Sequence, residues 1–356
     1  MQLSKNKVII ACAGSGKTTY IVEEALKSKD KKILVTTYTN ENLNQIKTFL
    51  VEKIGCIPTN ITVQTWFSFL LQEGVRPYQN QMTDRGRVES IFFFENIKDV
   101  GKLKRTLRYI PELQDSHYFT DNNYIYEDKV SKFICKCNER SNNWVINRLE
   151  NIYSHIFIDE LQDLAGYDLE LLELLFNSKI NIVSVGDPRQ ATFSTNTAQK
   201  YRQYRRSNIF SWLKEKEKKN EIAIEEINES HRCNKYICDF ASNIFPDLPK
   251  MVSKNSKSTG HDGIFIINNN RVGDYIKTYD PVILRYSKKT DTLGFHGINI
   301  GLAKGRTYKR VLIFPTKPML EYLKTKDTSK AGDKTKFYVA VTRAKYSVAF
   351  VVSNNT

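Results

Sequence analysis

One short stretch near the start of the chain constrains the fold more than any other. Residues 11–18 read ACAGSGKT, directly after an apolar segment at residues 8–11 and directly before residues 18–27, which have helical spacing. A glycine-rich turn between a buried strand and a helix presents backbone N–H groups that bind phosphates. The strict pattern has Gly at the position of Ala11, and a small residue there still allows a tight loop. The sequence therefore predicts a P-loop in an α/β sheet.

The side chains of this turn have expected roles. Lys17 would reach the β- and γ-phosphates of a nucleotide such as ATP, and the Thr18 hydroxyl would bind Mg²⁺. A chance glycine-rich turn is the alternative, which Gly-Lys-Thr with correct segments on both sides disfavours. The residues expected to hold the nucleotide here are Ala13, Gly14, Ser15, Gly16, Lys17, Thr18 and Thr19.

A second polar cluster follows the apolar residues 155–158 and reads Asp-Glu-Leu-Gln-Asp at residues 159–163. Carboxylates at the end of a buried strand cost free energy unless a metal ion or a water network uses them. Asp159 suits Mg²⁺, and Glu160 suits activation of an attacking water. Alone, the pair could equally be a helix N-cap with a first-turn acid. Together with the P-loop, it is interpreted as catalytic.

Short apolar segments alternate with amphipathic ones along the chain, which is typical of α/β proteins with parallel sheets. Between residues 76 and 150 aromatics are frequent and strands are hard to assign, so we expect a mostly helical insertion with helices at residues 87–97 and 130–140. A polar stretch at residues 253–262 is expected to be a loop or linker, and residues 234–245 a helix. The strands of two sheets are expected at residues 8–11, 33–37, 61–63, 155–158, 180–185, 264–267, 282–284, 311–314 and 348–352.

Composition limits the class of partner. The net charge of +15 suits a polyanion, because neutralising phosphates releases counterions, although a basic surface also serves solubility. The chain has neither a run of about 20 apolar residues nor the apolar core of a secretion signal, so we expect a cytoplasmic protein without a membrane partner. The cysteine spacing makes no paired zinc pattern.

Further motifs follow in a fixed order, and together they resemble the Rep/UvrD branch of superfamily 1 helicases over nearly the whole chain. Each later motif alone is weak, whereas their order is specific. The resembling segments are residues 11–18 (P-loop), 36–40 (TTYTN), 64–69 (QTWFSF), 159–163 (DELQD), 185–190 (VGDPRQ), 230–232 (SHR), 301–308 (GLAKGRTY) and 339–344 (VAVTRA).

The resemblance implies roles for single residues. Gln190 and Arg232 would contact the γ-phosphate, and Arg343 would be the arginine finger that stabilises charge developing during phosphoryl transfer. Phe193 falls where the family places an aromatic that stacks on a base. The resemblance also implies a nucleotide contact at Gly305 and DNA contacts at Thr39, Asn40, Thr65, Trp66, Phe67, Phe193 and Lys304.

The resemblance implies an α/β fold with two RecA-like parallel-sheet motor domains and a mostly helical insertion in the first. Residues 1–75 and 151–200 would form the first motor domain, residues 76–150 the insertion, and residues 201–356 the second motor domain. ATP hydrolysis with Mg²⁺ between the two would drive 3′–5′ movement along single-stranded DNA or a 3′-tailed duplex through domain closure.

The chain departs from the family in three places. Thr195 and Asn196 stand where the family usually adds a Trp that grips the DNA base. The family's adenine-reading Gln motif has no clear counterpart before Ala11, so loose adenine selectivity is expected. Between Arg232 and Gly301 there is little room beyond the second domain's own strands, so we expect no second accessory domain. We therefore expect the monomer to unwind DNA only weakly.

Two other hypotheses of function are compatible with the sequence. The chain could be a DNA-stimulated ATPase switch that regulates a protein partner such as a nuclease, as in Gabija-type bacterial antiviral defence, where small ATPases of this branch occur. A non-catalytic binding module is the third reading, which the intact Lys17, Thr18, Asp159, Glu160 and Arg343 disfavour. The tract at residues 200–206, KYRQYRR, would either follow a DNA strand or form a solvated basic helix.

Overall fold

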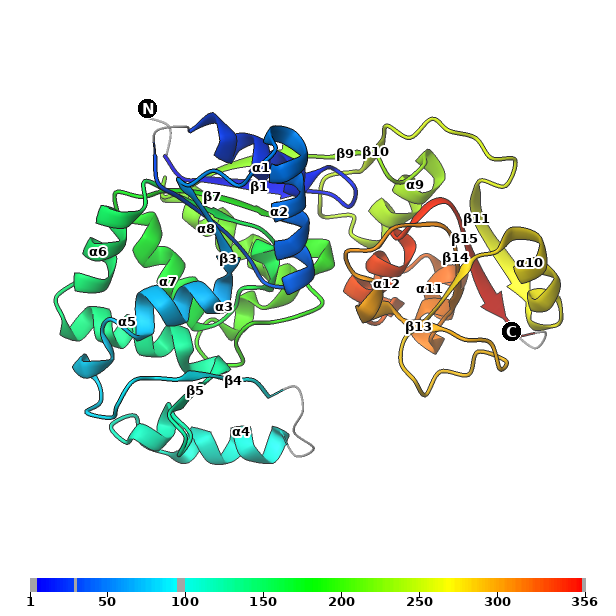
Figure 1. Ribbon diagram of the computed structural model, residues 1–356. Helices are drawn as coiled ribbons and strands as arrows, with labels where there is room; N and C mark the ends of the chain where they lie inside the picture. The colour runs from blue at the N-terminus through cyan, green and yellow to red at the C-terminus, as the bar shows by residue number, and fades with distance from the viewer. Residues whose placement is uncertain (1–4, 29–30, 95–99, 354–356) are drawn as a thin grey trace. The chain divides into compact units, whose positions relative to one another are not determined.

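The computed structural model describes residues 5–28, 31–94 and 100–353, without the side chain of Arg108. The chain folds into two compact units, and each is described by itself (Figure 1). Unit 1 comprises Met1–Val8, Thr18–Val185 and Phe193–Ile224, and unit 2 comprises Ile9–Lys17, Gly186–Thr192 and Glu225–Thr356. Among the described residues, no helix has the length and apolarity that crossing a bilayer requires.

A six-stranded sheet has the order β3-β2-β6-β7-β1-β8. β2 pairs in parallel with both β3 and β6, and β6 pairs in parallel with β7. The strands predicted from the apolar runs are confirmed. The runs in β1, β2 and β6 are almost entirely buried, as expected inside a parallel sheet, whereas β3 lies at the edge and is mostly half-buried. The strands are β1 (Lys7–Ala11), β2 (Ile33–Thr37), β3 (Ile61–Thr65), β6 (His155–Ile158), β7 (Asn181–Gly186) and β8 (Ala223–Ile227).

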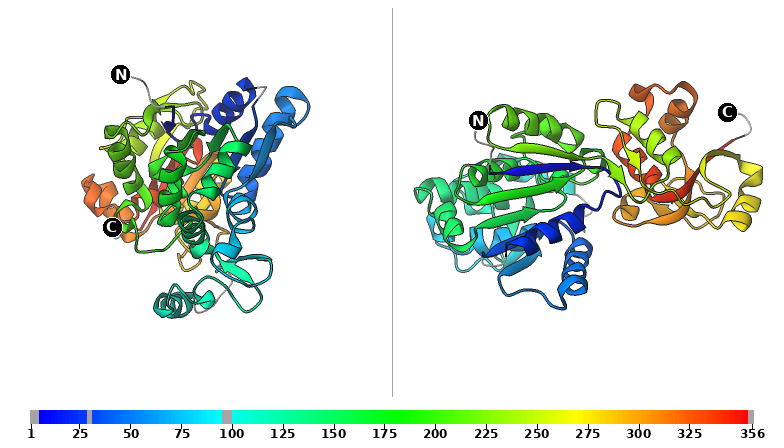
Figure 2. Two further views of the ribbon diagram at one scale, coloured as in Figure 1. Left: turned by 90° about the vertical axis from the view of Figure 1, so that its left-hand side faces the viewer. Right: turned by 90° about the horizontal axis from the view of Figure 1, so that it is seen from above.

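Helices cover both faces of this sheet. Figure 2 shows α1 and α2, in blue, on one side of the strands and α8, in green, on the other. The P-loop, Tyr38, Asp159 and Asp187 directly follow the carboxyl ends of β1, β2, β6 and β7, as is usual for functional groups of parallel sheets. The helices are α1 (Lys17–Lys27), α2 (Asn40–Ile54), α7 (Tyr167–Phe176) and α8 (Ile209–Lys218).

The segment between β3 and β6 is mostly helical. Its helix at residues 130–140 is confirmed as α5, whereas the predicted helix at residues 87–97 is wrong where the structure describes it. Ser90–Phe92 form β4, which pairs in parallel with β5 (Tyr124–Tyr126), and residues 95–97 lie outside the described residues. The other elements are α3 (Trp66–Phe69), a π-helical turn (Leu70–Val75), α4 (Val100–Tyr109), α5 (Val130–Arg140) and α6 (Trp144–Ile152).

The error at β4 has a physical cause. The run Ile91-Phe92-Phe93-Phe94 consists of β-branched and aromatic residues, which favour a pleated strand over a helix. Phe92 and Phe94 both pack against Tyr126, at ring-centroid distances of 5.6 and 5.8 Å. Packing against a partner strand that is distant in sequence therefore makes this segment a strand and not a helix.

Unit 2 contains a five-stranded sheet of order β11-β15-β14-β12-β13, and its strand pairs are all parallel. The strands and the helix predicted here are confirmed, and residues 254–262 form neither helix nor strand. The strands are β11 (Gly263–Asn268), β12 (Val282–Arg285), β13 (Ile298–Asn299), β14 (Tyr308–Phe314) and β15 (Ala344–Val352), beside a small pair of β9 (Glu229–Ser230) and β10 (Val252–Ser253).

Alternate residues of β14 show how the helices cover both faces of this sheet. Val311 and Ile313 belong to a core with α9, α11 and α12, whereas Leu312 and Phe314 belong to a second core with α10. This is the period of two that a strand imposes on its side chains. The helices are α9 (Lys235–Ile244), α10 (Val272–Tyr279), α11 (Lys317–Thr325) and α12 (Lys334–Val341). The predicted α/β fold with RecA-like parallel sheets is confirmed.

Candidate nucleotide and nucleic-acid sites

The P-loop follows β1 and requires glycine at Gly14. This residue has φ +77°, and a Cβ placed on it would lie 2.5 Å from the Cβ of Arg232 and 2.8 Å from Ser230 Oγ. Ser230 Oγ donates a hydrogen bond to Ala13 O at 2.7 Å, and His231 N donates to Gly14 O at 2.9 Å. Gly16 also has positive φ, at 82°. Glycine is therefore favoured at both positions, because a residue with a side chain would be strained at these positive φ angles.

Two polar side chains of the P-loop, Ser15 and Lys17, are only weakly engaged by the described residues. Lys17 Nζ makes long contacts to Ala11 O (3.4 Å) and Cys12 O (3.3 Å). Among the described residues, the buried hydroxyl of Ser15 has no hydrogen-bond partner. A buried unpartnered hydroxyl costs free energy unless a ligand or water satisfies it. These observations fit a loop that holds phosphate, with Thr19 following on α1.

In unit 1, Thr18 and Asp159 provide the oxygen ligands expected for Mg²⁺. Thr18 Oγ1 lies 3.4 Å from Asp159 Oδ2, and Asp159 Oδ1 accepts from Glu160 N at 2.9 Å. Within the described part of the chain there is no cluster of three or more His, Cys, Asp or Glu that could hold a metal ion. Two protein oxygens, completed by phosphate and water, match the way Mg²⁺ is usually bound at nucleotide sites.

Glu160 adopts a conformation that is rare for residues other than glycine, with φ +58°. Gln162 Nε2 donates a hydrogen bond to its carboxylate, and Asn42 Nδ2 lies 3.5 Å from it. Backbone strain of this kind persists where the surrounding structure fixes it, often at functional sites. The geometry therefore singles out Glu160 as a carboxylate held in a defined direction.

Asp187, just after β7, is the centre of a buried network in unit 2. Its carboxylate is fully buried and accepts from Arg189 Nε (2.7 Å), Gln190 Nε2 (2.8 Å) and Tyr338 OH (3.1 Å). Burial alone raises the pKa of Asp187, but the charges of Arg189 and Lys17 and its hydrogen bonds outweigh burial, so the pKa is lowered. Asp187 is therefore ionised in the folded protein at neutral pH.

Tyr338 on α12 was not identified from the sequence. Its hydroxyl accepts a hydrogen bond from Ala13 N at 3.2 Å and donates to Asp187. Burial raises its pKa well above the ordinary value, so the ring stays neutral. The side chain thus connects the P-loop backbone to the acid after β7. The only sequence signal was its position directly before residues 339–344, the segment that resembles a helicase motif and contains Arg343.

Arg343 belongs to the same network. It is 1% exposed, and its Nη2 donates to Gln190 Oε1 at 3.0 Å. Its Nη1 donates to Arg306 O at 3.3 Å, next to Gly305 (φ +82°), while Arg232 Nη1 donates to Thr342 O at 3.2 Å. Three of the residues predicted to contact the γ-phosphate, Gln190, Arg232 and Arg343, therefore lie in one region of unit 2.

Unit 1 presents a row of four aromatic rings. Phe193 is 42% exposed and its ring centroid lies 6.5 Å from that of Tyr38, which lies 5.9 Å from Phe67. Phe67 meets Phe93 edge-on at 5.3 Å, and Phe93 is 46% exposed. The rings come from four separate segments of the chain. Phe67 and Phe193 were predicted as DNA contacts, whereas Tyr38 and Phe93 were not.

The other predicted DNA contacts differ in their surroundings. Thr39 and Thr65 cap helices α2 and α3 by accepting from Asn42 N and Ser68 N, both at 3.2 Å. Asn40, the first residue of α2, is exposed, and Lys304 is half-buried in the loop before β14.

Trp66, also predicted to contact DNA, is 1% exposed and donates from its Nε1 to Asp168 Oδ1 at 3.1 Å. Ser131 of α5 and Thr195 also donate to the Asp168 carboxylate. Burial raises the pKa of Asp168, partly offset by these hydrogen bonds. The Trp66 ring therefore has no exposed face on which a base could stack. Asp168 instead links α3, α5 and the segment after Phe193 through hydrogen bonds.

This cluster gives the departure at Thr195 and Asn196 a structural role. Both side chains are buried, and Asn196 Nδ2 donates to Asp128 O at 3.1 Å while its Oδ1 accepts from Ala198 N at 2.8 Å. The two residues anchor the segment that carries Phe193, where a Trp would have added exposed aromatic surface.

The basic tract at residues 200–206 is not a continuous helix. It contains the 3₁₀ turn Arg202–Tyr204, and a second turn, Arg206–Asn208, begins at its last residue. Lys200 pairs with Glu170 at 2.5 Å, and Tyr201 OH donates to Glu173 at 3.1 Å. Glu170 on α7 therefore neutralises Lys200, the first charge of the tract.

Comparisons with known proteins add to this geometry. Residues 78–208 match the model of the UvrD/REP helicase N-terminal domain. A protein of Mycoplasma capricolum described as a probable DNA helicase II homolog is 26% identical over 176 residues, which is 49% of this chain and 21% of that protein. The helicase nonstructural protein 10 of an arterivirus superposes over 98% of this chain and 60% of its own, with TM-score 0.52 and 16% identity. A structure of that helicase with DNA gives TM-score 0.52, 15% identity, and coverage of 98% and 61%.

The parallel sheets, the P-loop and the acids after β6 define a P-loop α/β protein with the fold of helicase motor domains. Within that class, the resemblance of its motifs to UvrD/Rep-type superfamily 1 helicases is confirmed by the family-model match over residues 78–208 and by the Mycoplasma relative. The chain spans about one fifth of the Mycoplasma relative and about three fifths of the viral helicase.

Proposed function

We propose that this protein is a DNA-dependent ATPase that moves along single-stranded DNA in the 3′–5′ direction. The observation that carries the proposal is the grouping of the candidate catalytic residues. Thr18, Asp159 and Glu160 adjoin one another in unit 1. In unit 2, the network of Asp187 contains Gln190 and Arg343 and reaches the P-loop through Tyr338.

The residues suit ATP hydrolysis in the following way. Backbone N–H groups of residues 13–16 and the Lys17 ammonium would hold the phosphates, and Thr18 and Asp159 would hold Mg²⁺. When bound, Mg²⁺ neutralises charge on the β- and γ-phosphate oxygens. Glu160 would accept a proton from the water whose oxygen attacks the γ-phosphorus, while the bond from that phosphorus to the bridging oxygen breaks and ADP leaves.

Arg343 would stabilise charge on the transferred phosphoryl group. Its guanidinium donates to Gln190, which in turn donates to Asp187. A movement of Arg343 at the phosphates would therefore change the hydrogen bonds of both residues. Tyr338 extends the same chain of hydrogen bonds to the backbone of Ala13. We therefore propose that this network couples the nucleotide state to the conformation of unit 2.

Steady-state ATPase activity with and without single-stranded DNA tests the proposal. The wild type is expected to be strongly stimulated by DNA, and Lys17→Ala is expected to abolish turnover in both conditions. Displacement of streptavidin from biotin at one end of an oligonucleotide then tests direction, because 3′–5′ movement clears only the 5′ end. An ATPase that DNA does not stimulate would rule the proposal out.

A second candidate is an ATPase switch that regulates a nuclease in bacterial antiviral defence. It is favoured by the elements between Arg232 and Gly301, which all belong to unit 2 and leave no further domain in this described stretch. DNA binding without turnover, together with co-purification of a nuclease whose activity depends on ATP, would favour the switch over the translocase.

Phe193 is proposed to stack on a DNA base, since its exposed ring is backed by Tyr38. Phe193→Ala should weaken binding of single-stranded DNA by about 1–3 kcal/mol, the usual contribution of one base–aromatic stack. Phe193→Tyr should retain the affinity. Fluorescence anisotropy with a labelled oligonucleotide measures the difference. Tyr109→Ala removes another exposed ring of unit 1 and is the matched control; an equal loss in the control would refute a specific stack at Phe193.

A further inference from the structure

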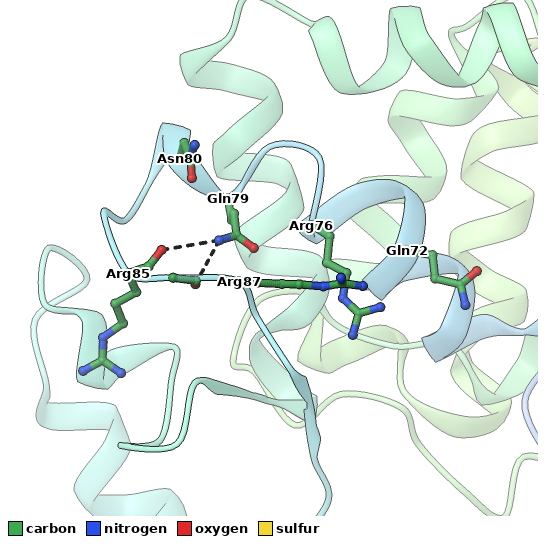
Figure 3. A pocket seen from close by; sticks show the side chains of 7 residues that line it. Gln72, Arg76, Gln79, Asn80, Arg85 and Arg87 are labelled. Carbon is green, nitrogen blue, oxygen red and sulfur yellow. Dashed lines mark hydrogen bonds between the residues drawn. The ribbon is translucent and has the colours of Figure 1, made fainter.

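A pocket of about 710 Å³ lies where the chain leaves the π-helical turn Leu70–Val75 (Figure 3). No acidic side chain lines it, and every lining residue other than Gly86 has a guanidinium or amide group. These residues are Gln72, Arg76, Gln79, Asn80, Arg85 and Arg87. Such a lining produces a positive local potential, because no carboxylate of the wall balances the arginines.

Side-chain bonds to the backbone fix the wall of this pocket. Gln79 is 7% exposed, and it donates from Nε2 to Gly86 O and accepts at Oε1 from Val88 N, both at 3.0 Å. Arg76 donates from Nε to Val88 O at 3.0 Å and from Nη2 to Glu89 O at 2.7 Å. These acceptors are neutral carbonyl oxygens, so Arg76 is held in place while its charge remains uncompensated.

Arg87, in contrast to Gln79 and Arg76, does not hold the pocket wall in place. It is exposed, and among the residues that the structure describes it forms no hydrogen bond or ion pair. In Figure 3 its side chain extends in the direction of Arg76. Arg85 points away from both, and its Nε binds Asp115 at 3.1 Å. Arg76 and Arg87 therefore supply the pocket's available positive charge, at a cost in mutual repulsion that a bound anion would remove.

We propose that this pocket binds phosphate groups in the backbone of a single DNA strand, as a contact additional to the aromatic row. Guanidinium groups match the geometry of phosphate oxygens, and phosphate contacts position a strand without reading its sequence. The lining contains no aromatic ring on which a nucleobase could stack, which favours the strand backbone over a free nucleotide. The proposal rests on the proposed function, since it names a further contact to the same substrate.

Arg87→Gln tests the proposal, because this substitution breaks no bond of the described structure. Binding of a single-stranded oligonucleotide is measured by anisotropy over a series of salt concentrations. Losing one phosphate contact lowers the slope of log K against log salt by about 0.7 for single strands. We expect this drop for Arg87→Gln and a slope close to the wild type for Arg87→Lys. Arg105→Gln removes the same charge from an exposed position on α4 and should leave the slope unchanged.

The outcomes separate this proposal from the proposed function. Unchanged slopes in Arg87→Gln, or an equal drop in Arg105→Gln, would overturn the pocket as a phosphate site while DNA-stimulated ATPase stands. A weaker affinity for an ATP analogue with an unchanged DNA slope would assign the pocket to nucleotide and overturn the backbone contact. A wild type that binds no DNA would remove both proposals.

Discussion

Glu160→Gln is expected to lower ATP turnover by about 100- to 10,000-fold, the usual contribution of a positioned general base. The substitution keeps the shape of the side chain and removes only its ability to accept a proton. The carboxylate is held by Gln162 and lies near Asn42, so its direction depends on the folded structure of unit 1. Steady-state and single-turnover ATPase assays at saturating DNA measure the effect.

Two controls separate lost chemistry from lost structure. Binding of a non-hydrolysable ATP analogue and of single-stranded DNA should remain close to the wild type. Glu41→Gln, on the exposed first turn of α2, changes the same residue type without touching Asp159 or Glu160 and should leave turnover unchanged. Turnover by Glu160→Gln within a few-fold of the wild type would show that another group accepts the proton.

Asp187→Ala is expected to have the largest effect on stability. It leaves Arg189, which is itself fully buried, without its carboxylate partner. Breaking a buried ion pair by removing one member costs about 3–5 kcal/mol, because the remaining charge stays out of water. Hydrogen exchange of peptides from α12 and β14 measures this loss in unit 2. All three tryptophans, Trp66, Trp144 and Trp212, belong to unit 1, so their fluorescence reports the other unit.

A double variant keeps this prediction testable if Asp187→Ala folds poorly. Combining it with Arg189→Met removes the uncompensated charge and should recover much of the lost stability. Asp239→Ala, at an exposed position on α9, is the control and should change stability by no more than about 0.5 kcal/mol. If the double variant is as unstable as Asp187→Ala, the ion pair is not the reason for the loss.

The same network makes the stability of unit 2 dependent on pH. Asp187 has a lowered pKa in the folded state, so its contribution is fully present above its unfolded pKa of about 3.9 and is lost as pH falls through the lower folded value. Asp187→Asn should therefore flatten the pH dependence of hydrogen-exchange protection in α12 below about pH 4. A dependence as steep as in the wild type would assign the acid sensitivity to another group.

Much of the fold could be predicted from local pattern. Apolar runs such as residues 155–158 are strands because three consecutive buried side chains, after the half-buried His155, suit the inside of a parallel sheet. The P-loop could be placed because its glycines, its lysine and its flanking elements are contiguous in sequence. The helix at residues 130–140 followed from its spacing. Local pattern failed at β4, whose partner β5 lies more than thirty residues further along the chain.

The sequence by itself determined which residues are candidates for ATP chemistry, since Lys17, Thr18, Asp159 and Glu160 stand in short contiguous motifs. Only the tertiary structure decided which side chains surround them. Tyr338 donates a hydrogen bond to Asp187, which lies 151 positions away in sequence. Asp168 accepts hydrogen bonds from Trp66, Ser131 and Thr195, which belong to three separate segments. Periodicity reports which face of an element is buried, but not what that face meets. The aromatic row arises where four separate segments converge, so no single stretch of sequence contained it. The pocket that Arg76 and Arg87 line comes from residues 72–87 alone, but only the folding of that stretch back on itself brings these side chains together.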